Sequence, residues 1–349
     1  MSNHALPRPR FNAPEPEHGP PEQRTRAALK LEARTAPLLQ GKVSAFPDEL
    51  FGWAMRLCGV AVVALLGLIV YQLVMGSQLS WHAFGWKFFG QSDWNPVEDQ
   101  YGALPFIYGT IVSSVLSLVI AVPLAVGVAV FITEMCPVAL RGVLSFTTEL
   151  LAAIPSVVYG LWAIFVLVPL IREYVEPILA RTLGWTGFFS GPPYGIGMLA
   201  AGVILAIMVI PIISSITREV LTVVPQHQRE AVLALGATRW EMIRMGVLRN
   251  ARAGIVGAII LGLGRALGET MAVTMVIGNR PVIAKSLFAP GYTMASVLAN
   301  EFTEASGDLY LSALIEIGLA LFFVTIVVNA LARIMVWSVT RGQPPRSLA

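Results

Sequence analysis

Residues 106–133 read FIYGTIVSSVLSLVIAVPLAVGVAVFIT, a run of twenty-eight residues without a charged side chain. A helix needs about 20 mostly apolar residues to cross a hydrocarbon layer of about 30 Å. Backbone polar groups inside lipid must be satisfied within the segment itself, so a run of this kind is helical there. This stretch therefore predicts a helix that crosses a membrane.

The rest of the chain has the same character. Of its 349 residues, 56% are hydrophobic and only 13% are charged, and the mean hydropathy is +0.70. Soluble chains carry about 25% charged residues, so the composition excludes a soluble domain and predicts an all-α membrane protein with six transmembrane helices. The predicted spans are Trp53–Gly76, Phe106–Thr133, Leu144–Ile171, Ile196–Thr217, Ala253–Gly278 and Leu309–Trp337. Prolines inside these runs predict kinks: Pro123, Pro155, Pro169 and Pro211.

The distribution of Lys and Arg predicts the orientation of these spans. With the N-terminus inside, eighteen of the 24 basic residues lie on the cytoplasmic side and five on the opposite side. Arg265 is the remaining one and lies within a span. Because cytoplasmic loops carry the excess of Lys and Arg, we expect both termini in the cytoplasm.

The first fifty residues differ from the rest. They contain eight of the 23 prolines with mixed charges between them, a composition that cannot bury enough apolar surface to fold. We predict a disordered cytoplasmic tail over 1–50, with at most a short helix around Ala27–Leu39. It lacks the apolar region of a cleavable signal peptide. The six-helix membrane domain then covers 51–340, and 341–349 form a short cytoplasmic tail.

The residues for enzyme chemistry are missing from the sequence. Two cysteines and four scattered histidines form neither a disulfide framework nor a metal cluster. No nucleophile–base set is evident. No G-x-x-x-x-G-K-[ST] sequence occurs, so this chain is not its own ATPase.

The loop of residues 218–252 is the most informative polar stretch. Pro225 followed by helix formers up to Gly236 predicts a short helix. Thr238 and Glu241 have the spacing of a capping box, which predicts a second short helix. Two short helices hinged at Gly236 would form a lever on the membrane face. The alternative is an amphipathic hairpin that lies against anionic lipid.

The fifth span contains an intramembrane charge pair. Arg265 and Glu269 are four residues apart, so on a continuous helix they share a face and can pair. Gly264 and Gly268 form a small-xxx-small pair that lets another helix approach. The pair either packs between helices or lies on a solute path, where a guanidinium suits an oxyanion. Desolvation makes a buried ion pair a weak stabiliser, so we favour the path.

Three other acids lie in or beside the predicted spans. Glu134 stands at a cytoplasmic boundary, where we expect it to cap the membrane exit. Glu149 and Glu316 are candidates for contacts between helices or for pore lining. The sequence leaves these two roles open.

The 218–252 loop resembles a known coupling element. Glu230-Ala231 followed by Gly236 is similar to the EAA-x3-G loop of ABC importer permeases, which docks into a groove of a separate ATPase subunit. The resemblance implies a fold like that of type I ABC importer permeases. The residues it implies in ATPase coupling are Glu230, Ala231, Gly236, Thr238, Arg239 and Glu241.

Two further stretches resemble one family of these permeases. Residues 262–279, GLGRALGETMAVTMVIGN, are similar to the fifth-span signature of the PstC family, membrane subunits of the bacterial high-affinity phosphate ABC importer. Residues 154–160, IPSVVYG, are similar to a third-span segment of that family. Thr-Met-Ala-Val after Glu269 favours PstC over the paralogous PstA, which usually has GETAPL. The implied pathway residues are Arg265, Glu269, Thr270, Ser156 and Tyr159, although Ser156 and Tyr159 fit a Pro155-kinked packing helix equally well.

The resemblance implies a subunit of the bacterial inner membrane that imports inorganic phosphate by alternating access. Its implied partners are a PstA-like permease, a PstB-like ATPase dimer, a PstS-like periplasmic phosphate-binding protein and membrane lipid, but no nucleic acid. ATP and Mg²⁺ are used by the ATPase, and no cofactor is expected on this chain. The alternatives are a permease for another oxyanion (sulfate or molybdate), an ion-coupled secondary transporter with Glu269 as proton site, and a membrane-embedded enzyme.

Overall fold

The computed structural model describes residues 45–340. These residues are helices and connecting loops, and their only β-type pairing is an isolated bridge between Asn95 and Gln100. Six helical stretches among them are long and apolar enough to cross a membrane, which confirms the predicted class and number of spans. They are Glu49–Gly76, Leu104–Met135, Ser156–Thr186, Met198–Thr222, Arg239–Leu267 and Asp308–Ile334.

The chain divides into two compact units between Gly67 and Leu68. Helix α2, Ala45–Gly76, begins in the first unit and ends in the second. Within the first unit its apolar side chains are exposed around the helix, which is typical of a membrane span. Residues 1–44 and 341–349, with the predicted helix Ala27–Leu39, lie outside the described residues.

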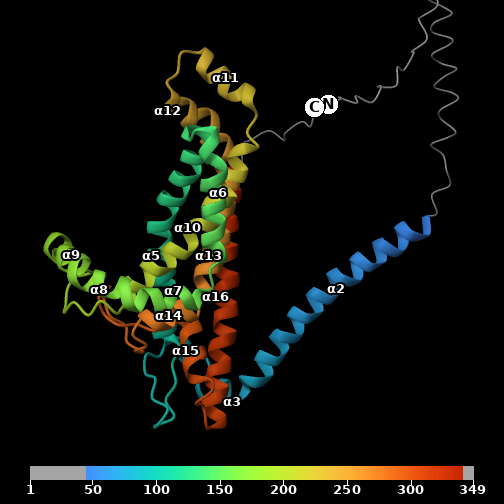
Figure 1. Cartoon of the computed structure of the whole chain (residues 1–349). Coiled ribbons are helices and arrows are strands. Elements are labelled where there is room, and N and C mark those ends of the chain that lie inside the picture. The colour runs from blue at the N-terminus through green and yellow to red at the C-terminus, as the bar shows by residue number, and fades with distance from the viewer. Residues whose placement is uncertain (1–44, 341–349) are drawn as a thin grey trace, which may run out of the picture. The chain divides into compact units, whose positions relative to one another are not determined.

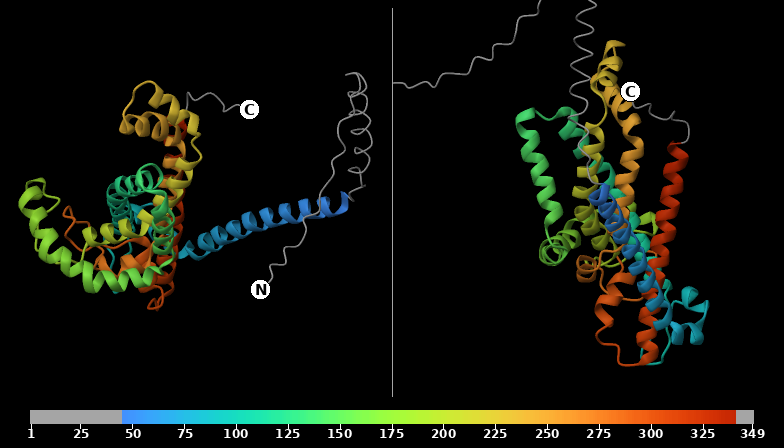
Figure 2. Two further views of the ribbon diagram at one scale, coloured as in Figure 1. Left: turned by 45° about the horizontal axis from the view of Figure 1, so that its top comes forward. Right: turned by 90° about the vertical axis from the view of Figure 1, so that its right-hand side faces the viewer.

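Four long helices form the bundle of the second unit. They are α5 (Leu104–Val130), α10 (Met198–Thr222), α13 (Arg249–Leu267) and α16 (Asp308–Thr340). Figures 1 and 2 show them running in broadly one direction. Helix α10 packs against both α5 and α13, and α13 packs against α16. Pro123 and Pro211 lie inside the continuous helices α5 and α10.

The third predicted span is broken rather than kinked. Helix α6, Val138–Ala153, ends before Pro155, and helix α7, Ser156–Trp162, begins after it. Ile154 and Pro155 are extended, with ψ of 129° and 140°, because a proline disfavours the helical conformation in the residue before it. The predicted boundaries Leu144–Ile171 are therefore wrong.

Helix α7 opens a long, irregular helical run that crosses the bundle direction (Figure 1). Its further helical parts are Ala163–Leu167 (π-helical), α8 Val168–Leu170, Ile171–Val175 (π-helical), α9 Glu176–Leu183 and Gly184–Thr186 (3₁₀). Pro169 lies in α8, between the two π-helical segments. The run from Ser156 to Thr186 is the stretch that has spanning length and apolarity.

The fifth predicted span is also broken. Helix α13 ends at Leu267, and the short helix α14, Met271–Val276, follows after Gly268–Thr270. Glycine is a poor helix former, and it stands at the point where α13 stops. The spanning stretch is Arg239–Leu267, so the predicted boundaries Ala253–Gly278 are shifted too far toward the C-terminus.

The two ends of the bundle differ. At one end lie α11 (Gln226–Ala234) and α12 (Arg239–Glu241), at the top of Figure 1. At the other end lie α3 (Gln78–Phe84), α4 (Lys87–Gly90) and α15 (Met294–Glu301). By the charge distribution, the α11 end is the cytoplasmic one.

Candidate functional site

The two broken helices pack against each other. Gly160 of α7 lies so close to α14 that a Cβ there would be 2.4 Å from the Met275 Sδ and 3.1 Å from the Ala272 Cα. Buried residues of α7, α10 and α14 share one apolar core with Tyr159, Ala272 and Val273. The structure thus brings together the IPSVVYG and GETMAV stretches, which are more than a hundred residues apart.

Arg265 and Glu269 meet beside this junction. The Arg265 Nη2 lies 3.2 Å from the Glu269 Oε2. The Ala272 N–H donates to the Glu269 Oε1 over 3.3 Å. The Glu269 side chain is 3% exposed and the Arg265 side chain 46% exposed. The carboxylate is therefore held in the protein, whereas the guanidinium reaches the open surface of the chain.

The predicted pairing is confirmed, but its predicted helical geometry is wrong. Arg265 stands in the last turn of α13, and Glu269 follows the end of that helix. Glu269 links two elements, because its N–H donates to the Ala266 carbonyl of α13 over 3.4 Å while its carboxylate accepts from the Ala272 N–H of α14. A relative movement of α13 and α14 would change the distance between the two charges.

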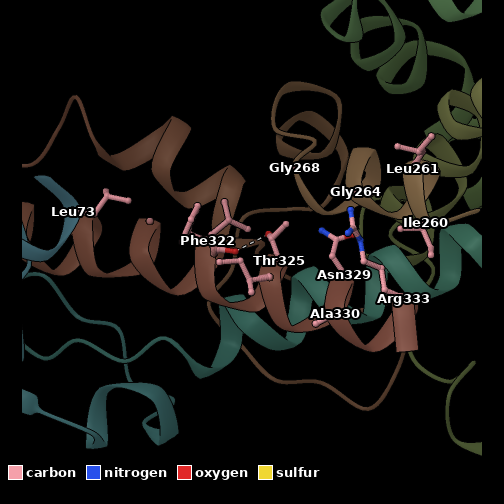
Figure 3. Close-up of a pocket in the computed structure, with 13 residues that line it drawn as sticks. Leu73, Ile260, Leu261, Gly264, Gly268, Phe322, Thr325, Asn329, Ala330 and Arg333 are labelled. Carbon is pink, nitrogen blue, oxygen red and sulfur yellow. Dashed lines mark hydrogen bonds between the residues drawn. The ribbon is translucent and has the colours of Figure 1, made fainter. Parts of the chain in front are cut away.

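The small-xxx-small pair does not contact another helix in the described residues. A Cβ on Gly264 would meet nothing within 4 Å, and one on Gly268 would meet only the Gly264 carbonyl. Both glycines line a groove of about 930 Å³ between α13, α16 and the end of α2 (Figure 3). The expected close helix contact is thus absent here, and Asn329 and Arg333 lie at one end of this groove.

The hydroxyl side chains at the junction have different surroundings. The Tyr159 hydroxyl donates to the Leu151 carbonyl over 2.8 Å, which joins α7 to the end of α6 across the break. The Thr270 hydroxyl donates to the Gly268 carbonyl over 3.4 Å. Ser156 is half-buried at the start of α7 and its hydroxyl has no hydrogen bond among the described residues. Tyr159 therefore has a clear structural task, and Ser156 has a free hydroxyl.

Helix α11 has an inner and an outer face. On the inner face Asn250 donates to Gln228 over 2.8 Å, and Val232 packs beside Gly246. On the outer face Glu230 and Ala231 are exposed. The outer face is thus free to contact another chain.

The predicted helix end at Gly236 and the predicted cap at Thr238 are confirmed. Gly236 has φ of +83°, a conformation that favours glycine. The Thr238 N–H donates to the Glu241 side chain over 2.8 Å, and the Glu241 N–H donates to the Thr238 hydroxyl over 3.4 Å. The second lever helix is not a separate one, because Arg239–Glu241 continues through a π-helical segment, Met242–Leu248, into α13.

Arg229 carries a contact that the sequence did not predict. Its Nη2 lies 2.8 Å from the Glu134 Oε1, and it also donates to the carbonyls of Leu221 and Val224. Glu134 is therefore an anchor of α11 rather than a simple cap at the membrane exit. The two charges are 95 residues apart, so no local spacing indicates their pairing.

The other two acids have distinct environments. The Arg218 Nη2 lies 2.6 Å from the Glu149 Oε1, so Glu149 makes a contact between α6 and α10. Glu316 is fully buried in α16, and neither carboxylate oxygen has a hydrogen-bond partner among the described residues. Within the described part of the chain, no group of three or more His, Cys, Asp and Glu side chains is arranged to hold a metal ion.

Sequence comparison finds close relatives. Residues 121–341 match the family described as binding-protein-dependent transport system inner membrane component. The phosphate transport system permease protein PstC of Mesorhizobium japonicum is 46% identical over 83% of this chain and 90% of its own length. The protein of the same name from Pasteurella multocida is 46% identical over 85% of this chain and 93% of its own length.

A solved structure supports the fold independently. A bacterial ABC transporter involved in the import of the acidic polysaccharide alginate contains a chain that aligns with a TM-score of 0.57 and 16% identity. The alignment covers 85% of this chain and 99% of that one. The arrangement of helices described above is thus that of an ABC importer permease.

Proposed function

This chain belongs to the PstC family of phosphate transport system permeases, and we propose that it lines one half of the path by which inorganic phosphate enters the cell. It is a multi-pass component of the inner membrane that works in a binding-protein-dependent ABC transport system. Its function is phosphate import. The alternatives left open by the residues, transport of sulfate or molybdate and ion-coupled secondary transport, lose their support.

The proposed pathway rests on the Arg265–Glu269 pair at the α13–α14 break. A guanidinium offers planar N–H donors that suit a phosphate oxyanion. Glu269 is fixed by the Ala272 N–H, so it can hold Arg265 while the path is empty and release it to phosphate. Thr270, which follows Glu269, and Ser156, at the start of α7, contribute hydroxyls to the path in this proposal, and Tyr159 maintains the α6–α7 corner.

The energy for transport comes from a partner in this proposal. A PstB-like ATPase dimer binds ATP and Mg²⁺ and contacts the outer face of the α11–α12 segment, in particular Glu230, Ala231 and Gly236. Thr238, Arg239 and Glu241 form the start of the helix that leads into α13. A PstA-like permease completes the path, and a PstS-like protein delivers phosphate from the other side. This chain binds no cofactor and catalyses no covalent step.

The test of the pathway is uptake of labelled phosphate by proteoliposomes that contain the complete complex. Arg265→Ala and Glu269→Gln should each reduce uptake at least tenfold, because each removes a charge-assisted contact. Arg280→Ala, in an exposed loop outside the pair, is the control and should keep normal uptake. Normal uptake by both pair variants would contradict the pathway, and uptake driven by a proton gradient without ATP would contradict the ABC mechanism.

The test of coupling uses the outer face of α11. Glu230→Lys reverses an exposed charge that makes no ion pair or side-chain hydrogen bond within the described residues, so the chain should fold as before. We expect ATP hydrolysis to lose its stimulation by the phosphate-loaded binding protein. Glu219→Lys, the same charge reversal at an exposed position of α10, is the comparison and should keep normal stimulation. Full stimulation in Glu230→Lys would refute docking at this face.

A further inference from the structure

A cavity of about 530 Å³ lies at the cytoplasmic end of the bundle, away from Arg265. It is bounded by α6, α10, α11 and the end of the second span. Its lining residues are Ile132, Thr133, Glu134, Arg141, Ser145, Arg218, Thr222, Gln226 and Arg229. Three of them are arginines, and Ile132 is the only large apolar side chain. We call it the arginine pocket.

Several hydrogen-bond donors of the arginine pocket are free. Arg141 uses its Nε to donate to the Cys136 carbonyl over 3.1 Å, and its two Nη groups have no partner among the described residues. The Ser145 hydroxyl and the Gln226 amide have none there either. Arg141 and Ser145 are four residues apart on α6, so they share one face.

The arginine pocket has a net positive charge, because its lining contains three arginines and one carboxylate. Glu134 is the only acid in the lining, and Arg229 already binds it. Arg218 is 15% exposed, and its partner Glu149 is 55% exposed and outside the lining. Because more than half of the Glu149 side chain is exposed, solvent screens this pair, and an incoming anion can compete with Glu149 for Arg218. Arg141 has no acidic partner within the described residues.

We propose that the arginine pocket is a second oxyanion site, which binds inorganic phosphate from the cytoplasmic side and thereby slows further import. Bidentate contacts from Arg141 and Arg218, with the Ser145 hydroxyl, provide the donors that a phosphate requires. A lipid phosphate has the same headgroup chemistry, but its acyl chains need an apolar wall, and the lining offers one large apolar residue. The choice of phosphate rests on the proposed function.

The position of the arginine pocket explains how bound phosphate would slow import. A phosphate held by Arg141 and Arg218 joins α6 to α10. The lining also contains Arg229, the residue that anchors α11. Occupancy therefore fixes the elements on which α11 acts, in the arrangement described above. Accumulated phosphate would stabilise this state, as any ligand stabilises the state that it binds.

The experiment measures initial uptake of labelled phosphate by proteoliposomes of phosphatidylcholine that contain the complete complex, with ATP and Mg²⁺ in the lumen. The lumen corresponds to the cytoplasm, and its unlabelled phosphate is varied. Wild-type uptake should fall as lumenal phosphate rises. Arg141→Gln should raise the half-inhibiting concentration about tenfold or more, with unchanged uptake when the lumen contains no added phosphate.

Two further variants and a control sharpen the result. Glu149→Gln frees Arg218 and should lower the half-inhibiting concentration, the opposite direction from Arg141→Gln. Ser145→Ala should raise it by a smaller factor and serves if Arg141→Gln does not fold. Arg249→Gln removes an exposed cytoplasmic arginine outside the pocket and should behave as wild type.

The outcomes are separable. If Arg141→Gln and Ser145→Ala respond to lumenal phosphate as wild type does, or if Glu149→Gln raises the half-inhibiting concentration, the proposal is overturned. The same holds if the effect of Arg141→Gln appears only when phosphatidylglycerol is added, since the ligand is then a lipid headgroup. Absence of phosphate uptake in the wild type without lumenal phosphate would instead contradict the proposed function.

Discussion

The guanidinium of Arg229 joins helix α11 to the membrane bundle through four acceptor atoms. Two are the carboxylate oxygens of Glu134, and two are the carbonyls of Leu221 and Val224. The side chains of Glu134 and Arg229 are 7% and 20% exposed. Removal of one partner from a buried ion pair costs about 3–5 kcal/mol. Because Arg229 reaches solvent, we expect Arg229→Ala to cost about 3 kcal/mol, near the low end of that range.

The decisive perturbation is the charge swap Glu134→Arg with Arg229→Glu. If the ion pair alone anchored α11, the swap would restore both stability and coupling. The structure predicts no rescue, because a carboxylate at position 229 would face the carbonyls of Leu221 and Val224 without a donor to offer them. Arg229→Lys should be intermediate, since one ammonium keeps the charge but does not satisfy four acceptors.

The assay has two readouts on the purified complex. The midpoint of thermal unfolding reports the anchor, and the ratio of phosphate transported to ATP hydrolysed reports coupling. Glu149→Gln is the matched control, because Glu149 is 55% exposed, so solvent screens its pair with Arg218 and its loss should cost less than about 1 kcal/mol. A swap variant with wild-type stability and coupling would refute the role assigned to the two carbonyls.

Three smaller perturbations test the junction and the coupling segment. Gly160→Ala should destabilise the fold by about 1–3 kcal/mol and lower the midpoint of thermal unfolding. Adding Met275→Ala should recover part of the lost stability, because it removes the sulfur atom that the new Cβ meets. An unchanged midpoint in Gly160→Ala would contradict the close packing of α7 on α14. Tyr159→Phe should cost about 1 kcal/mol through loss of the bond to Leu151 and leave the KM for phosphate uptake unchanged, whereas a raised KM would place the hydroxyl on the path. Thr238→Ala should reduce coupling and cost about 1 kcal/mol, and Thr238→Ser should restore both measurements.

The features that the sequence predicted correctly depend on local properties. The second, fourth and sixth spans extend within a few residues of their predicted ends, because apolar length is encoded in consecutive residues. The cap at Thr238 and the helix end at Gly236 were predictable for the same reason, since each depends on side chains within a few residues.

The breaks in the third and fifth spans were not predictable from hydropathy. The apolar run continues through Pro155 and through Gly268, so its length locates a helix but not its interruption. Pro155 indicated a disturbance, and the prediction of a kink underestimated it. The break between α6 and α7 is held by side-chain contacts that hydropathy does not report. The Tyr159 hydroxyl donates to the Leu151 carbonyl, and Gly160 packs against Met275. The Glu134–Arg229 contact escaped prediction for the same reason.

The break at Gly268–Thr270 allows the distance between Arg265 and Glu269 to change when α13 moves relative to α14. From Arg239 to Leu267 the chain is one helical stretch of 29 residues, which at 1.5 Å per residue spans about 43 Å. Its first residues follow α11, and Arg265 stands in its last turn. The N–H of Glu269 still donates to the Ala266 carbonyl of α13, but its carboxylate accepts from the Ala272 N–H of α14, which packs on α7. We therefore expect a displacement at the α11 end to move the arginine along one helical segment, while the bond to Ala272 holds the carboxylate at α14. On a continuous helix the same displacement would carry both charges together, and the pair would neither open nor close.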